Sequence, residues 1–187
     1  MARPLSETAR AKMLLATQEI VMLHGLDGFT IDEVSRRSGV AKSTLYRHFR
    51  TGDELLLVAV DDLIEEVDAP DTGSLRDDLR EMLNTFMAVA GNPKIRQLFV
   101  SILKRSITDP EFAATFRNVK EQRHAPLRVV LQRAMARGEV DPSIDVDLAM
   151  HMVEGPFVSK RMFADEDVTS RDADVLVELV VRALAPR

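Results

Sequence analysis

Side chains suited to contacting a nucleic acid gather in one short stretch of this 187-residue sequence. They are cations, hydroxyl residues, a histidine and the one tyrosine of the chain: Lys42, Ser43, Thr44, Tyr46, Arg47 and His48. At the N-terminal end of a helix that lies in a major groove, side chains such as Lys42 and Ser43 reach base edges. Further along such a helix, Tyr46, Arg47 and His48 bind phosphates, which fix register without reading sequence. The stretch therefore predicts a surface that contacts a duplex.

Local signals place this stretch on the second of two short helices. Thr30 and Glu33 form a capping box, so the first helix begins near residue 31. Ser38-Gly39 closes it, because glycine suits a left-handed turn. The second helix runs over about residues 42–49, and its inward positions are apolar: Val40, Leu45 and Phe49. Two short helices about a glycine turn form a helix-turn-helix, and the cap at Thr30 points backbone N–H groups outward for a further phosphate.

An ordinary helical bundle would also contain short amphipathic helices, and the order of the signals weighs against that reading. A capped helix, a glycine turn and a cationic helix are followed by a second capping box at Thr51 and Glu54. Residues 1–52 hold eight Lys and Arg against five Asp and Glu, a net charge of +3, whereas the whole chain carries −5. Residues 53–68 then hold seven acids and no base. Since phosphate neutralisation supplies most sequence-independent affinity for DNA, contact is expected at the N-terminal segment.

The composition excludes several other classes of protein. The chain has no cysteine, so disulfide frameworks, thiolate metal sites and a cysteine nucleophile are excluded. No apolar run approaches the ~20 residues that span a bilayer, and a signal-peptide core is lacking, so a cytoplasmic protein is expected. The histidines lack metal-ligand spacing, and neither a nucleophile elbow nor a phosphate loop is present. We therefore expect no enzyme, no metal and no cofactor.

The rest of the sequence predicts helices throughout. Apolar residues recur at three and four positions rather than at two, which predicts an all-α fold of about nine helices. Among them, one begins at the cap of Thr51 and reaches Val67, one runs from Asp145 to about Phe163 with an interruption at Gly155-Pro156, and the last runs from Ser170 to Leu184. Ala69-Pro70-Asp71-Thr72-Gly73 is the clearest linker. The expected domains are a three-helix head with the helix-turn-helix at 1–52, a connecting helix and linker at 53–73, and a larger ligand-binding and dimerisation domain at 74–187.

Residues 9–60 closely resemble the tetracycline-repressor (TetR) family of transcription regulators. The resemblance is carried by four segments: Gly28-Phe29-Thr30, Ile31 through Val34, Ser38-Gly39-Val40, and Lys42 through Phe49. The remaining residues resemble the family in being an all-helical ligand and dimerisation domain of suitable length. Within them, residues 137–149 are similar to one subgroup of that domain.

Two positions depart from the family pattern. Family members often place Ser before the recognition helix, where this chain has Ala41, and losing such a cap typically costs ~1 kcal/mol. The helix N-terminus would then depend on Ser43 or on a bound phosphate. Family members also commonly begin the fourth helix with Lys, where this chain has Gly52. Arg47 or Arg50 would replace that phosphate contact.

The larger domain offers candidates for binding a largely apolar small molecule. Phenylalanine and methionine side chains can line an adaptable cavity, although at helical spacing they also suit an ordinary core. Arg123 falls on an otherwise apolar stripe, where it would anchor a polar ligand group, pair with an internal acid or extend to the surface. The candidate ligand-binding residues are Phe86, Phe99, Phe116, Arg123 and Met152.

The resemblance implies a homodimer in which the last two helices pack against their symmetry mates as a four-helix bundle. A palindromic operator requires two heads whose half-site centres lie about one DNA turn (~34 Å) apart, or a multiple of it. The candidate interface residues are Leu148, Met152, Leu176, Val180 and Leu184. The same residues would equally cover the core of their own subunit.

The hypothesis is a ligand-responsive transcription regulator that binds a palindromic operator as a homodimer and is released or repositioned by a small molecule. A repressor is favoured over an activator. For this mechanism, the ligand needs only to bind one arrangement of the protein more tightly, and the operator to bind another arrangement more tightly. The alternative is a small-molecule-binding or protein-interaction helical module that has lost operator reading, which Ala41 and Gly52 would favour.

Overall fold

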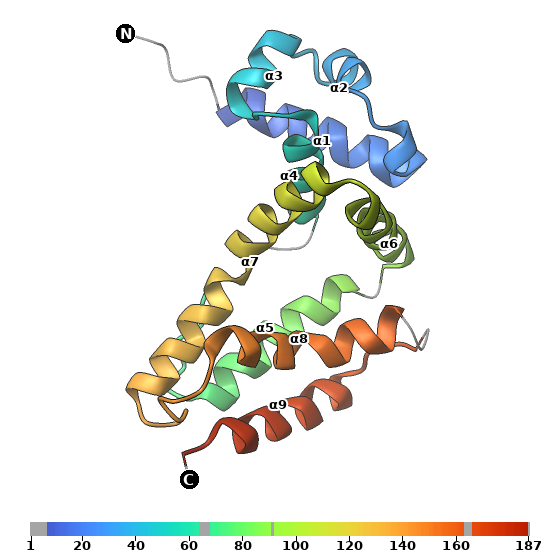
Figure 1. Cartoon of the computed structure of the whole chain (residues 1–187). Helices are drawn as coiled ribbons and strands as arrows, with labels where there is room; N and C mark the ends of the chain where they lie inside the picture. The colour runs from blue at the N-terminus through green and yellow to red at the C-terminus, as the bar shows by residue number, and fades with distance from the viewer. Residues whose placement is uncertain (1–6, 64–67, 91, 163–165, 187) are drawn as a thin grey trace, which may run out of the picture. The chain divides into compact units, whose positions relative to one another are not determined.

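The computed structural model describes residues 7–63, 68–90, 92–162 and 166–186, apart from the side chains of residues 86, 88–90, 123, 161 and 162. This part of the chain consists of α-helices and one 3-10 helix, η1, without a strand (Figure 1). The all-α prediction with about nine helices is confirmed. The elements are α1 (Glu7–His24), η1 (Leu26–Gly28), α2 (Ile31–Ser38), α3 (Lys42–His48), α4 (Gly52–Asp61), α5 (Leu75–Ala90), α6 (Pro93–Thr108), α7 (Pro110–Ala136), α8 (Val146–Met162) and α9 (Ser170–Leu184).

The chain forms two compact units, and each is made of two separate segments. The head unit comprises residues 1–64 and 93–121, and the C-terminal unit comprises residues 65–92 and 122–187. Helix α6 and the first part of α7 therefore belong with the head, although they follow α5 in sequence. The boundaries expected at residues 52 and 73 follow chain order and stay a prediction.

Two hydrophobic clusters hold the head unit together. The first joins α1 to the helix-turn-helix and α4, and its fully buried members include Met13, Ile20, Val34, Leu45 and Leu55. The second joins α1 and α4 to α6 and the start of α7: Val21, Leu56, Leu57, Val60, Leu98, Ile102 and Phe112. Helices α1 and α4 both contribute to each cluster, so the recognition helix and α6 depend on the same two helices.

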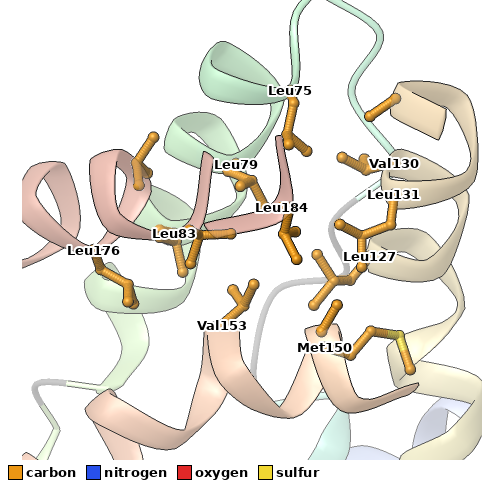
Figure 2. Packing of buried hydrophobic residues seen from close by; sticks show 14 of the residues in the cluster. Leu75, Leu79, Leu83, Leu127, Val130, Leu131, Met150, Val153, Leu176 and Leu184 are labelled. Carbon is orange, nitrogen blue, oxygen red and sulfur yellow. The ribbon is translucent and has the colours of Figure 1, made fainter. Parts of the chain in front are cut away.

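The C-terminal unit has one large apolar core. Figure 2 shows it closing between α5, α7, α8 and α9, with contributions from Leu75, Leu79, Leu83, Leu127, Val130, Leu131, Met150, Val153, Leu176 and Leu184. A buried carboxylate fixes the beginning of α5 nearby. Asp78 is fully buried and accepts hydrogen bonds from the Thr72 backbone N–H (2.7 Å), the Thr72 hydroxyl (2.7 Å) and the Arg137 Nη2 (3.2 Å). Because every oxygen of this carboxylate has a donor, the buried charge is compensated.

Two helices differ from the prediction, one in its length and one in its continuity. The sequence predicted a helix reaching Val67, whereas α4 ends at Asp61 and a turn follows at residues 62–63; residues 64–67 lie outside the described part. Asp61 and Asp62 stand at the C-terminal end of α4, where the helix dipole disfavours acids. The interruption predicted at Gly155-Pro156 is wrong, because α8 continues through it. Pro156 removes one intrahelical hydrogen bond, and the helix continues on the bonds of the residues around it.

No helix in the described ranges combines the length and the apolar character needed to cross a membrane.

Candidate nucleic-acid interface

The beginning of α2 is set by Thr30 and Glu33. The Thr30 hydroxyl accepts a hydrogen bond from the Glu33 backbone N–H at 3.1 Å, as the sequence predicted. The predicted capping box is only half formed, because the Glu33 carboxylate turns along the helix instead of returning to the cap. It accepts from the Arg36 Nε (2.8 Å) and the Arg37 Nε (2.7 Å). These hydrogen bonds, the Arg36 bond first, lower the pKa of Glu33 to about 2.

The turn between α2 and α3 requires glycine. Gly39 has φ 67°, in the left-handed region that L side chains rarely adopt, and its N–H donates to the Ser35 carbonyl at 3.1 Å. The Ser35 hydroxyl donates to the Val40 carbonyl at 2.7 Å, so the residues before and after the glycine are joined. These bonds fix the direction in which the chain enters α3.

Helix α3 has one buried side and one exposed side. Leu45 is fully buried, Phe49 directly after the helix is 3% exposed, and both lie in the cluster that contains Val34. The polar residues lie on the other side: Lys42, Ser43, Tyr46 and Arg47 are exposed, Tyr46 by 55%. The structure thus brings most of the predicted DNA-contacting side chains to one surface. Their contact with DNA stays a prediction.

Two of the predicted contacts are less accessible than the others. Thr44 and His48 are half-buried. The Nε2 atom of His48 is buried and has no hydrogen-bond partner among the described residues, and its ring lies tilted against Phe49 with centroids 6.4 Å apart. Thr30 is exposed at the beginning of α2. Contact through Nε2 of His48 therefore requires a rearrangement that Arg47 does not need.

The two departures from the family pattern have different physical settings. Ala41 precedes α3 and provides no side-chain cap, so that helix begins on backbone hydrogen bonds alone within the described structure. Gly52 begins α4 against the side chain of Ile31, where an added Cβ would lie 3.0 Å from the Ile31 Cδ1. Glycine at residue 52 therefore lets α4 begin close against α2, a packing role that the sequence did not reveal.

Sequence reasoning missed ion pairs of the head unit, including one at the beginning of α3 and one at the beginning of α4. Lys42 of α3 pairs with Asp32 of α2. Arg105 of α6 donates two hydrogen bonds to the carboxylate of Asp53 in the first turn of α4, each 2.8 Å long, and its guanidinium lies 4.1 Å from the centroid of the Phe112 ring. Partners 52 residues apart cannot be recognised from spacing.

The predicted ligand-binding residues are not brought together as one set. Phe99 and Phe116 face each other edge to face in the head unit, with ring centroids 6.3 Å apart. Met152 packs against the core of the C-terminal unit. The side chains of Phe86 and Arg123 lie outside the described part.

The predicted interface residues divide into buried and exposed ones. Leu176, Val180 and Leu184 are 7%, 1% and 3% exposed and fill the core of their own subunit, the alternative that the pattern left open. Met152 is half-buried against the same core. Leu148 of α8 is 68% exposed, and α9 carries two apolar side chains that the sequence analysis did not single out, Val175 and Leu179, at 52% and 59% exposed. Their i, i+4 spacing was the available signal.

Comparisons with known proteins give the same family for both parts of the chain. Residues 14–59 match the family described as "Bacterial regulatory proteins, tetR family", and residues 69–180 match "Tetracyclin repressor-like, C-terminal domain". The HTH-type transcriptional regulator AqdR of Rhodococcus erythropolis is 31% identical over 147 residues, which is 78% of this chain and 70% of AqdR. The DNA-binding transcriptional repressor TetR of Mycobacteroides abscessus is 27% identical over 152 residues, 79% of each chain.

A solved structure is similar over nearly the whole length. The TetR family transcription regulator SCO0332 superposes with a TM-score of 0.78 at 28% identity, covering 96% of this chain and 100% of that one. The two family matches and the similar solved structure therefore agree with the helix-turn-helix that α2 and α3 form. The chain belongs to the TetR family of helix-turn-helix transcription regulators.

Proposed function

We propose that this regulator is a cytoplasmic, ligand-responsive repressor without catalytic activity that binds a palindromic operator as a homodimer. The observation that carries the proposal is the two-sided recognition helix. Leu45 fixes α3 to the head core, and this leaves Lys42, Tyr46 and Arg47 exposed together. An exposed cationic face on a rigid support is what groove entry requires.

In the proposed complex, the two ends of α3 have different roles. Lys42 and Ser43 reach base edges, because they lie in the first turn of the helix. Tyr46 and Arg47 bind phosphates, with Thr30 at the beginning of α2 as a further contact. Thr44 and His48 support these contacts from half-buried positions.

A salt titration with operator and random DNA tests this mode of binding. The operator is sought as an inverted repeat beside the gene that encodes this protein. Affinity for both DNAs is expected to fall steeply with salt, while the preference for operator persists. Lys42→Ala is expected to change base preference, and Tyr46→Phe to weaken binding to all sequences equally. A wild-type protein that binds operator and random DNA equally would support the alternative, a helical module that has lost operator reading.

The dimer is proposed to form through exposed apolar side chains of α8 and α9. Leu148, Val175 and Leu179 are between 52% and 68% exposed in the single chain. Leu179→Asp is therefore expected to yield monomers in sedimentation velocity. The matched control is Ile107→Asp on α6, which introduces the same charge at an apolar side chain that is 83% exposed and should leave the dimer intact. A dimer that persists in Leu179→Asp would contradict this interface.

The effector is proposed to act through α7 and α6. Helix α7 contributes residues to both units, and the head unit includes α6. A ligand bound by residues of the C-terminal unit can bias an arrangement of α7 that the head then follows, provided it binds one arrangement more tightly. Arg105 and Asp53 are proposed to transmit the movement, because they join α6 to the first turn of α4.

Of the five candidate ligand-binding residues, Phe86, Arg123 and Met152 belong to the C-terminal unit and are proposed to form the site, whereas Phe99 and Phe116 belong to the head unit. Once an effector is identified, Arg123→Ala is expected to reduce its affinity. An unchanged affinity would remove Arg123 from the site.

A further inference from the structure

The pair formed by Lys42 and Asp32 lies on the surface proposed to face DNA. Asp32 belongs to the first turn of α2 and Lys42 to the first turn of α3, and the Lys42 Nζ contacts the Asp32 Oδ1. Both side chains are accessible, Lys42 by 52% and Asp32 by 78%. The pair therefore presents a donor and an acceptor side by side at the beginning of the recognition helix.

Asp32 is not needed to complete the ionic contacts of its own helix. Glu33 beside it accepts from both Arg36 and Arg37, and Thr30 provides the cap. Exposed ion pairs add little to stability, because solvent screens them. A carboxylate on this surface also repels phosphates and so opposes sequence-independent binding. The position of Asp32 is therefore better explained by discrimination between DNA sequences than by a contribution to the stability of the fold.

The chemistry of the major groove suits such a pair. Guanine presents the acceptors O6 and N7, and its partner cytosine presents the amino group N4 next to them. An ammonium beside a carboxylate matches this order, with Lys42 donating to guanine and Asp32 accepting from cytosine. An A·T pair in the same orientation is a poorer match, because the adenine N6 amino group would face the ammonium and the thymine O4 acceptor would face the carboxylate.

We propose that Asp32 and Lys42 together read one G·C base pair in each half-site of the operator. Asp32 acts as a specificity-determining residue in two ways. It contacts cytosine directly, and it holds the Lys42 ammonium at the base edge and away from phosphates. This inference rests on the proposed operator binding by α3, and it adds a contact from α2.

The test compares wild-type protein with Asp32→Asn, Lys42→Ala and the control Asp27→Asn. The control removes the same charge from an exposed residue of η1. Affinity is measured for the operator, for operators with each base pair of the half-site replaced in turn, and for random DNA over a range of salt. The substituted residues are exposed, and circular dichroism verifies that the variants fold.

The expected result is one position per half-site at which replacing G·C by A·T weakens wild-type binding about 10-fold. This penalty should disappear in Lys42→Ala and fall several-fold in Asp32→Asn, and it should persist in Asp27→Asn. For random DNA, Asp32→Asn is expected to steepen the log–log salt dependence by about 0.9, because the released Lys42 can neutralise one more phosphate.

Other results would overturn the inference. If wild-type protein prefers its operator and Asp32→Asn keeps the same base preference at every position, Asp32 has no part in reading. If Asp32→Asn gained the same affinity for all DNAs, Asp32 would only repel phosphates and would take no part in reading sequence. If wild-type protein shows no operator preference at all, the proposed operator binding itself has failed, which is distinguishable from both outcomes.

Discussion

Replacing Leu45 by alanine tests whether α3 is held by its buried side. Leu45 is fully buried in a cluster with Val34, Phe49 and Leu55. The substitution removes three carbon atoms from that core, which at ~0.8 kcal/mol for each buried carbon amounts to roughly 2.4 kcal/mol. The residual cavity raises the expected loss to about 3 kcal/mol, within the range of ~2–5 kcal/mol for buried leucines.

Urea unfolding measures this loss directly. With a slope of about 2 kcal/mol/M, a loss of about 3 kcal/mol lowers the midpoint by about 1.5 M. All samples are compared at one protein concentration, because dimerisation shifts apparent stability. Operator affinity is measured on the same samples, and Leu45→Ala is expected to weaken it because α3 loses its support.

The neighbouring residue provides the matched control. Tyr46 lies on the same helix and is 55% exposed, so Tyr46→Ala should change the free energy of unfolding by less than about 0.5 kcal/mol. It should still reduce affinity for DNA of any sequence. The reasoning would be refuted if Leu45→Ala unfolded at the wild-type midpoint, or if the two variants were equally destabilised.

Three further predictions concern charged groups. The pKa of Glu33 is lowered from 4.5 to about 2, so the stability that this carboxylate adds is present above pH 4.5 and is lost as the pH falls towards 2. The difference in urea midpoint between wild type and Glu33→Gln should therefore shrink over that window. Asp78→Ala removes a fully buried acceptor and should cost about 3 kcal/mol, because the donors of Arg137 and Thr72 lose their partner. A double-mutant cycle with Arg105→Gln and Asp53→Asn should give a coupling of about 1 kcal/mol for their partly exposed, two-bond pair.

Each of these predictions has its own control and contrary outcome. For Glu33, a difference from the variant that stays constant between pH 5 and pH 2 would contradict the lowered pKa. For Asp78, the control is Glu81→Ala on the exposed side of the same helix, and equal losses would contradict the buried role. For Arg105 and Asp53, strictly additive effects would show that the pair contributes nothing.

Local signals in the sequence predicted the secondary structure of the recognition region. A cap at Thr30 and a left-handed position at Gly39 act within a few residues, so their effects can be recognised without knowledge of the fold. Helix α9 spans the residues that its apolar spacing predicted, and the structure adds a complete capping box at Thr169 and Asp172, which the sequence analysis did not identify. The buried side of α3 followed from the spacing of Leu45 and Phe49.

Contacts between distant segments could not be predicted in this way. Both sides of α9 carry apolar residues at helical spacing, so the pattern did not reveal that Val180 faces its own core while Leu179 faces outward. The grouping of α6 with the head depends on Leu98 and Ile102 reaching α1 and α4, which chain order does not suggest. The contact between Asp32 and Lys42 likewise depends on how α2 and α3 lie against each other.

The position of Tyr46 has a consequence for spectroscopy. It is the one tyrosine of a chain without tryptophan, and it stands on the outer side of the recognition helix. The tyrosine emission of this protein therefore originates at the surface proposed to meet DNA. A change in its intensity or polarisation during a titration would report contact at α3 without an attached dye, so the unlabelled chain carries its own optical probe.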